Sequence, residues 1–171
     1  MGGNSSLGKV PEKSGSRVAF VFPGQGSQCL GMGKLFYETD CQARKLFDTA
    51  SAVLGFDLPA LCFDGPDDRL NLTEYTQPAI LTVSVAALHA LIRAGISPLA
   101  VAGHSLGEWT AVVAADGVEF PDAVQVVRKR GRYMQEAVGT GHGIVAAVLG
   151  VPRDVIVESC QTASRLGVVC P

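Results

Sequence analysis

The stretch LAVAGHSLG, residues 99–107, decides how this chain is interpreted. Its apolar beginning predicts a short strand that stops at Gly103. From Ser105 onward, the small and apolar residues SLGEWTAVVAA predict a helix that ends near Asp116. The turn between them reads Gly-x-Ser-x-Gly, and a strand, a sharp turn and a helix in that order are typical of a nucleophile elbow. We therefore interpret Ser105 as a nucleophile; the alternative is a serine that only caps the helix.

The residue types around the turn suit that chemistry. A serine at a strained corner projects its hydroxyl above the sheet, and the flanking glycines leave room for the chain to turn. The backbone N–H of Leu106 lies at the start of the helix, where unpaired donors and the helix dipole stabilise a developing oxyanion. Ser105 and Leu106 are thus candidate catalytic residues.

The composition describes one compact globular domain, or two only if one is small or incomplete. The 171 residues are 47% hydrophobic and 18% charged, and the formal net charge is −2. This charge provides no electrostatic footprint for nucleic acid or for an acidic membrane surface. The most apolar long run, residues 78–94, is interrupted by polar residues and is shorter than the ~20 residues that a bilayer requires. We expect neither a nucleic-acid partner nor a membrane partner.

The cysteines and the first residues indicate the compartment. Five scattered cysteines form no Cys-x-x-Cys pair and no ligand spacing with the three histidines, so we expect no metal site. An odd, scattered set is typical of buried, reduced thiols in a cytoplasmic protein. Residues 1–16 are polar and rich in glycine and serine, which predicts a disordered leader without the apolar core of a secretory signal.

The first apolar run, RVAFVF at residues 17–22, predicts a parallel strand covered on both faces. The loop PGQGSQ follows at residues 23–28. It resembles a phosphate-binding turn, but Cys29 stands where G-x-G-x-x-G has its third glycine, and the Lys-Ser/Thr of a P-loop is absent. Nucleotide binding is therefore disfavoured.

Helical patterns account for most of the remaining core. One helix is capped by Asp40 and ends before Gly55. A second has Pro78 in its first turn, ends at Gly95 and is apolar nearly all round, so we expect it deep in the core. A third is predicted over residues 121–137.

The third helix places Arg130 on its apolar stripe, whereas Arg128 and Arg132 point elsewhere and are expected in solvent. The stripe consists of Ala123, Val127, Met134 and Ala137. A buried guanidinium needs an anion, because an unpaired buried charge is very costly. An internal carboxylate, a ligand, or a side chain that reaches outward to water would each satisfy Arg130, and the helix pattern alone leaves these alternatives open.

A second, smaller layer is predicted after the glycine-rich break at residues 139–143. The pattern gives a strand at 144–149, a helix at 152–163 and the beginning of a strand at 168–170. The sequence ends at Pro171, in the middle of this β-α-β pattern. We expect an incomplete layer, because a strand without a neighbour leaves its edge unpaired.

Several motifs together resemble one family. They are FVFPGQGSQ (20–28) followed by GMG (31–33), TQPAI (76–80), AGHSLGE (102–108) and RGRYMQEA (130–137). In this order and spacing they resemble the malonyl-CoA:acyl-carrier-protein transacylases of fatty-acid synthesis. They are also similar to the acyltransferase domains of polyketide and animal-type fatty-acid synthases. The resemblance covers all but the leader, over about the first half of the family's length.

The resemblance implies an α/β fold with two parts. Residues 17–138 would form a parallel sheet with flanking helices, an α/β-hydrolase-like acyltransferase core. Residues 139–171 would begin a ferredoxin-like small subdomain that is left incomplete.

The resemblance also implies roles for single residues. Ser105 would take the malonyl group from malonyl-CoA as an ester and pass it to the phosphopantetheine thiol of acyl carrier protein. The backbone N–H of Gln25 would complete the oxyanion hole with that of Leu106. Arg130 would pair with the malonyl carboxylate through two parallel hydrogen bonds, which lysine cannot copy. Leu106 favours malonyl, since methylmalonyl-selective domains tend to carry glutamine there.

Further candidates for the substrate site are Met134, Gln77 and His104, although Met134 and Gln77 could equally be core residues. The resemblance implies no permanently bound cofactor, with malonyl-CoA as substrate and acyl carrier protein as partner. We expect a monomer.

The departure from the family concerns its general-base histidine, which lies far downstream of the serine and has no match here. His104 adjoins the nucleophile and points away from it, His89 is expected to pack on its helix, and His142 is expected to be exposed. A general base contributes typically about 10²–10⁴ in rate. We therefore expect a part of a longer transacylase; the alternative is a shortened product with little turnover.

Two other functions remain as alternatives. One is a serine esterase or thioesterase of the α/β-hydrolase type, with water as acceptor, which the FPGQGSQ loop and Arg130 disfavour. The other is a catalytically incomplete module that docks acyl carrier protein, for which the missing histidine is the only support.

Overall fold

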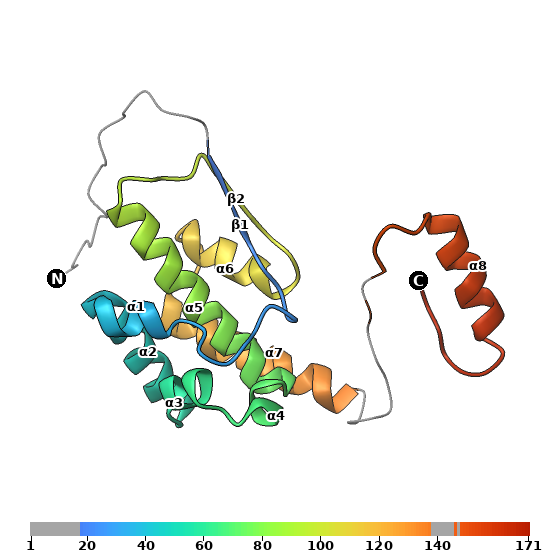
Figure 1. Ribbon diagram of the computed structural model, residues 1–171, viewed down its shortest axis with the longest axis horizontal. Helices are drawn as coiled ribbons and strands as arrows, with labels where there is room; N and C mark the ends of the chain where they lie inside the picture. Colours follow the sequence, from blue (N-terminus) through green and yellow to red (C-terminus); the bar gives the residue numbers. More distant parts are fainter. Residues whose placement is uncertain (1–17, 138–145, 147) are drawn as a thin grey trace. The chain divides into compact units, whose positions relative to one another are not determined.

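The computed structural model describes residues 18–137, 146 and 148–171 (Figure 1). The chain divides into two compact units between residues 138 and 139. The elements of the first unit are β1 (Ala19–Phe22), α1 (Lys34–Thr39), α2 (Cys41–Leu54), α3 (Leu58–Phe63), α4 (Asp67–Leu70), α5 (Thr73–Arg93), β2 (Ala100–Gly103), α6 (Leu106–Ala114) and α7 (Phe120–Ala137). The second unit contains α8 (Arg153–Ala163). The expected α/β class is confirmed, with a small parallel sheet and more helix than predicted.

The two strands place two loops side by side at one end of the sheet. β1 and β2 pair in parallel, with Phe22 opposite Gly103 at their carboxyl ends. One residue further, the backbone N–H of His104 donates to the Phe22 carbonyl at 3.2 Å. In open α/β sheets, ligands bind outside the carboxyl ends of the strands. The fold thus brings the 23–28 loop to the turn that carries Ser105.

Helices cover one face of this sheet. Phe20 and Phe22 are buried against Leu88 of α5 and Ala111 of α6. On the opposite face Val21 is 75% exposed. The prediction that the strand at 17–22 is covered on both faces is therefore wrong for the described residues, because α5 and α6 both pack on the phenylalanine side.

The helix α5 lies at the centre of the first unit (Figure 1) and is buried at every position from residue 76 to residue 82. The prediction of a deep core helix is thus confirmed. Its predicted start was wrong, because α5 begins at Thr73 and Pro78 lies inside it. The turn before the proline is closed by the N–H of Thr76, which donates to the Leu72 carbonyl at 2.9 Å, and this bond does not need the N–H that proline lacks.

By length and composition alone, α5 is long and apolar enough to cross a membrane, because it begins at Thr73, before the apolar run of residues 78–94. However, 61% of its apolar window is buried within the fold. A helix that is apolar all round and covered by protein is typical of a core helix.

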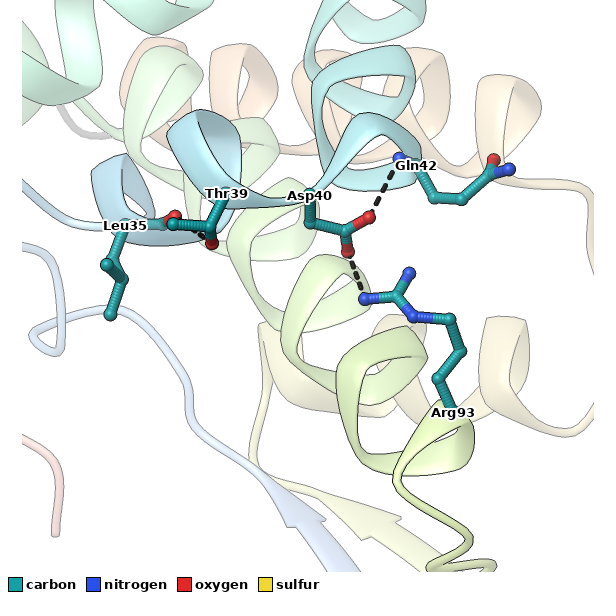
Figure 2. A network of polar contacts seen from close by, with 5 residues as sticks. All are labelled: Leu35, Thr39, Asp40, Gln42 and Arg93. Atoms are coloured by element: carbon teal, nitrogen blue, oxygen red, sulfur yellow. Dashed lines mark hydrogen bonds and ion pairs between the residues drawn. The ribbon is translucent and has the colours of Figure 1, made fainter.

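Both predicted ends of α2 are confirmed. The Asp40 carboxylate accepts a hydrogen bond from the Gln42 backbone N–H at 2.9 Å, and the helix closes at Gly55, whose φ is 74°. Asp40 also forms an ion pair with Arg93 at the end of α5 (Figure 2). The hydrogen bond from Arg93 lowers the pKa of the Asp40 carboxyl. One side chain therefore caps α2 and ties it to the central helix.

The main core lies among α2, α3, α5 and α7, and the short helices α1, α3 and α4 were not predicted. Four to six residues are too few to display a helical period. Tyr37 of α1 and Phe63 of α3 enclose Phe47 of α2, with ring centroids 5.6 Å from the Phe47 centroid in both cases. The short helices thus complete an aromatic cluster that their own patterns do not reveal.

At Gly131, α7 lies close against the backbone of α5. A Cβ there would lie 2.5 Å from the Thr73 carbonyl oxygen and 2.8 Å from the Glu74 Cα. The buried residues of α7 are Ala123, Val124, Val127 and Gly131. The predicted stripe is therefore confirmed in its first half and wrong in its second, since Met134 is 46% exposed and Ala137 is also exposed. The buried face of α7 ends at Gly131, which lies against Thr73 and Glu74 at the start of α5.

The two arginines expected in solvent differ. Arg128 is partly buried: it donates to the Leu54 carbonyl and lies over the Phe56 ring, 5.6 Å from its centroid. That prediction was wrong, because the end of α2 offers an acceptor and an aromatic face at this point. Arg132 is exposed as expected and pairs with Glu136 at 3.4 Å.

The second unit confirms the helix predicted at 152–163, which is α8. The strand predicted at 144–149 lies partly outside the described residues, and Ala146, Val148 and Leu149 belong to no strand. Residues 168–170 also form no strand, contrary to the prediction, because no described segment pairs with them. The expected leader, 1–16, lies outside the described residues. The expectation of buried thiols is wrong for most of the cysteines: Cys62 lies in the main core, whereas Cys29, Cys41 and Cys170 are exposed.

Candidate active site

The predicted elbow is present. Ser105 stands between the end of β2 and the first residue of α6 with φ 54° and ψ −104°, a strained backbone for a residue with a side chain. A Cβ at Gly103 would lie 1.9 Å from the Gly107 carbonyl carbon, and a Cβ at Gly107 would lie 2.2 Å from the Phe22 carbonyl oxygen. Only glycine fits at both positions, so the Gly-x-Ser-x-Gly pattern is a steric requirement of this turn.

The 23–28 loop lies against the elbow. A Cβ at Gly24 would be 2.7 Å from the His104 carbonyl oxygen and 2.9 Å from its Nδ1. Among the described residues, neither the backbone N–H of Gln25 nor that of Leu106 has a hydrogen-bond acceptor. Two unpaired donors at adjoining turns are what an oxyanion hole requires. Their role there, predicted from the sequence, stays a prediction.

Arg130 reaches the serine from α7. Its Nη2 donates to Ser105 Oγ at 3.1 Å, and its Nη1 donates to Gln77 Oε1 at 2.8 Å. The side chain is partly buried, so both arms of the guanidinium are directed into the site. The predicted nucleophile and the predicted carboxylate-binding group are therefore in direct contact, although 25 residues separate them in the chain.

Gln77 holds the guanidinium in this position. It is fully buried, accepts from Arg130 through Oε1, and donates through Nε2 to the Met134 sulfur at 3.3 Å. Both ends of the amide are thus occupied by protein groups. Gln77, predicted as a substrate contact, is placed to orient Arg130.

Met134 borders a shallow, mostly apolar groove of about 520 Å³ on α7, beside the guanidinium. Its lining consists of Val126, Lys129, Arg130, Tyr133, Met134 and Ala137. A larger hollow of about 730 Å³ lies over α2 and α3, with Tyr37, Phe56 and Asp57 among its lining residues, and it contains none of the predicted site residues. The groove on α7 is therefore the one that concerns the candidate site.

The described histidines do not provide a base for Ser105. His104 is exposed and its ring lies beside Gly24, while no histidine among the described residues hydrogen-bonds to Ser105 Oγ. Burial, with a contribution from the Arg93 charge, lowers the pKa of His89. His142 lies outside the described residues. Within the described part of the chain there is also no group of three His, Cys, Asp or Glu side chains able to hold a metal ion.

Sequence reasoning missed the polar contacts behind the 23–28 loop. Gln25 Nε2 donates to Thr73 Oγ1 at 3.1 Å, and Gln28 Nε2 donates to Asn71 Oδ1 at 2.7 Å. A helix start at Thr73 would have placed Thr73 and Gln77 four residues apart on one helix face. That signal was hidden by taking Pro78 as the first turn.

Comparison with known proteins gives matches along most of the chain. A family model described as "Acyl transferase domain" matches residues 19–163. The malonyl CoA-acyl carrier protein transacylase of Bacillus subtilis (strain 168) is 50% identical over 152 residues, which make up 89% of this chain and 48% of that protein. The chain spans about half the length of the curated relatives it matches.

Solved structures match as well. The acyl-carrier-protein S-malonyltransferase of Burkholderia pseudomallei 1710b is 47% identical, with a TM-score of 0.81, over 90% of this chain and 50% of that one. A type II PKS acyl-carrier protein in complex with its malonyl-transacylase gives a TM-score of 0.82 at 42% identity, over 88% of this chain and 49% of that one.

Proposed function

Because the chain belongs to the family of acyl transferase domains, we propose that it transfers a malonyl group from malonyl-CoA to acyl carrier protein, in fatty-acid biosynthesis, through an ester on Ser105. The observation that carries the proposal is the hydrogen bond from Arg130 Nη2 to Ser105 Oγ at 3.1 Å. This bond places the positively charged guanidinium of Arg130 beside the nucleophile. The names of the relatives and the solved complex with a carrier protein support the same reaction.

The first half-reaction forms the ester. Ser105 Oγ attacks the thioester carbonyl of malonyl-CoA while its proton passes to a general base, and the carbonyl oxygen becomes an oxyanion that the Leu106 and Gln25 N–H groups stabilise. The carbon–sulfur bond then breaks, and coenzyme A leaves as a thiol after protonation. We assign the base to the histidine that the family resemblance implies, because Arg130 only donates to Oγ.

The second half-reaction reverses these steps with a new thiol. The phosphopantetheine thiol of acyl carrier protein gives its proton to the same base as its sulfur attacks the ester carbonyl, and the same two N–H groups stabilise the oxyanion. The bond between the carbonyl carbon and Ser105 Oγ then breaks, and Oγ takes the proton back from the base. Since the two half-reactions share one site, the coenzyme A must leave before the carrier protein binds, which gives ping-pong kinetics.

Arg130 selects the acyl group in this proposal. In a malonyl ester on Ser105, only a carbonyl carbon and one methylene separate Oγ from the carboxylate, which brings the carboxylate to the guanidinium. A planar guanidinium binds a carboxylate through two parallel hydrogen bonds, and Gln77 keeps its plane in place. An acetyl group has no carboxylate for the guanidinium to bind, so the site prefers a malonyl group.

Further parts of the proposal follow the same family. We propose a cytoplasmic monomer that holds no permanent cofactor, and a second unit that begins a ferredoxin-like subdomain.

The test compares malonyl-CoA with acetyl-CoA as acyl donors to the protein and to its Arg130→Ala and Arg130→Lys variants. We expect the wild type to be acylated faster by malonyl-CoA, the alanine variant to lose that preference, and the lysine variant to restore it only in part. Equal rates with both donors in the wild type would contradict the assignment of Arg130. Release of free malonate without transfer to a carrier thiol would instead favour an esterase.

A further inference from the structure

The two glutamine side chains of the 23–28 loop are bound to a single segment, residues 71–73, where α5 begins. Gln25 Nε2 donates to Thr73 Oγ1 at 3.1 Å. The Gln28 side chain accepts from the Gly26 backbone N–H at 2.8 Å and donates to Asn71 Oδ1 at 2.7 Å. The loop is therefore tied to residues 71–73 at two points.

The tie continues into α4. Asn71 Nδ2 donates to Asp67 Oδ2 at 2.9 Å, so the Gln28 amide, the Asn71 amide and the Asp67 carboxylate form one hydrogen-bonded series. In this series each amide uses its carbonyl as an acceptor and its NH₂ as a donor, which fixes its orientation. Glycine restricts the backbone little, so the residues of this loop do not fix its conformation by themselves. The series of hydrogen bonds fixes it instead.

The same end of α5 also supports the other half of the site. Gln77 follows Thr73 by one helical turn and holds Arg130 at 2.8 Å. Gly131, the neighbour of Arg130, would place a Cβ 2.5 Å from the Thr73 carbonyl. The loop with the Gln25 N–H and the helix with the guanidinium thus rest on one segment.

We propose that Thr73 and Asn71 are positioning residues for the oxyanion hole, which hold the Gln25 backbone N–H at its place opposite Leu106. The proposal rests on the proposed acyl transfer. The Gln25 side chain then holds the loop in place through its bond to Thr73, and the Gln25 backbone N–H donates to the oxyanion. Loss of the bond to Thr73 allows the donor to move, and a misplacement of about 1 Å can cost up to about 10²-fold in rate.

The experiment uses Thr73→Val, which keeps the shape of threonine and removes the acceptor, with Thr73→Ser as the matched control that keeps the hydroxyl. Ser105 acylation by malonyl-CoA is followed over a range of concentrations. We expect Thr73→Val to lower the maximal rate by about 10-fold with an unchanged half-saturating concentration, since the oxyanion donor acts mainly in the transition state. Thr73→Ser should stay within about twofold of the wild type.

A double variant distinguishes a positioning role from general damage. If Gln25 and Thr73 act through their mutual bond, Gln25→Leu combined with Thr73→Val should be no slower than the slower single variant. Rate losses that multiply would overturn the proposal, as would a wild-type maximal rate in Thr73→Val. The Gln28→Leu and Asn71→Leu pair repeats the test at the second tie.

A measurement that does not depend on catalysis, backbone hydrogen exchange, tests this proposal separately from the proposed function. Backbone hydrogen exchange in residues 24–28 should quicken in Thr73→Val and Asn71→Leu and stay at the wild-type rate in Thr73→Ser. Unchanged exchange in the first two variants would overturn the tie itself, whatever the activity. Faster exchange together with no acylation of the wild type by malonyl-CoA would retain the tie and reject both the acyl transfer and a role for the tie in it.

Discussion

Replacing Gly131 with alanine tests the close crossing of α5 and α7 that brings Arg130 to Ser105. A Cβ at this position meets the Thr73 carbonyl oxygen at 2.5 Å, the Glu74 Cα at 2.8 Å and the Thr73 carbonyl carbon at 2.9 Å. These are backbone atoms, so no side-chain rotation relieves the contact. To reach an ordinary 3.4 Å separation from the oxygen, α7 must move by roughly 0.9 Å, the difference between 3.4 and 2.5 Å.

The expected cost follows from two opposing effects. Overpacking costs about 1–3 kcal/mol, and the upper part of that range, about 2–3 kcal/mol, applies where backbone must move. Alanine is favoured over glycine inside a helix by about 1 kcal/mol. The free energy of unfolding should therefore fall by about 1–2 kcal/mol, and the urea midpoint by roughly 0.5–1 M.

Urea denaturation of Gly131→Ala measures this change, with Gly167→Ala as the control, because a Cβ at Gly167 meets no atom within 4 Å. The control should keep the wild-type midpoint. A midpoint for Gly131→Ala equal to or above that of the wild type would refute the close crossing, because only the helix propensity of alanine would then be felt.

Three further predictions concern a buried hydroxyl, a buried thiol and a half-buried imidazole. Thr110→Val should raise the free energy of unfolding by about 1 kcal/mol in urea denaturation, because the buried Thr110 hydroxyl has no partner among the described residues; a loss of stability would show that it has one. Burial raises the pKa of the Cys62 thiol to about 12, so an alkylating reagent at about pH 8 should label exposed Cys29 and spare Cys62 in peptide mass spectra until the protein is unfolded. Burial and then the Arg93 charge lower the pKa of His89, so the unfolded chain binds a proton near pH 6.5 that the folded chain does not. The free energy of unfolding should hence fall between about pH 7.5 and about pH 5.5, and His89→Gln should reduce that fall; an equal fall in both proteins would contradict it.

The features that sequence predicted correctly depend on short-range sterics and capping. The elbow could be predicted because Gly103, Ser105 and Gly107 meet one another within a single turn. The ends of α2 could be predicted because Asp40 and Gly55 satisfy its terminal backbone groups locally. The elbow pattern also predicted Ser105 as nucleophile and the Leu106 N–H as an oxyanion donor. The roles of Gln25 and Arg130 and the choice of malonyl were implied by the family resemblance.

The features that sequence did not predict depend on contacts between distant segments. Gln25 and Thr73 are 48 residues apart, and no periodic pattern connects a glycine-rich loop with the start of a helix. Arg128 was placed in solvent because its partner, the Leu54 carbonyl, is a backbone group that every residue has. The contact at Gly131 was not predicted, because the close approach of two backbones, rather than an apolar side chain, makes it.

The central claim, that Ser105 and Arg130 form a site for a carboxylated acyl group, is tested most directly by the mass of the protein after incubation with malonyl-CoA. The account predicts one malonyl adduct, located on the peptide that contains Ser105, absent from Ser105→Ala, and formed in preference to an acetyl adduct when both donors compete. An adduct that persists in Ser105→Ala, or an equal yield of malonyl and acetyl adducts in the wild type, would contradict it. Binding of acyl carrier protein without any adduct, also in a longer protein that includes the family's downstream histidine, would contradict it as well and would favour a docking module.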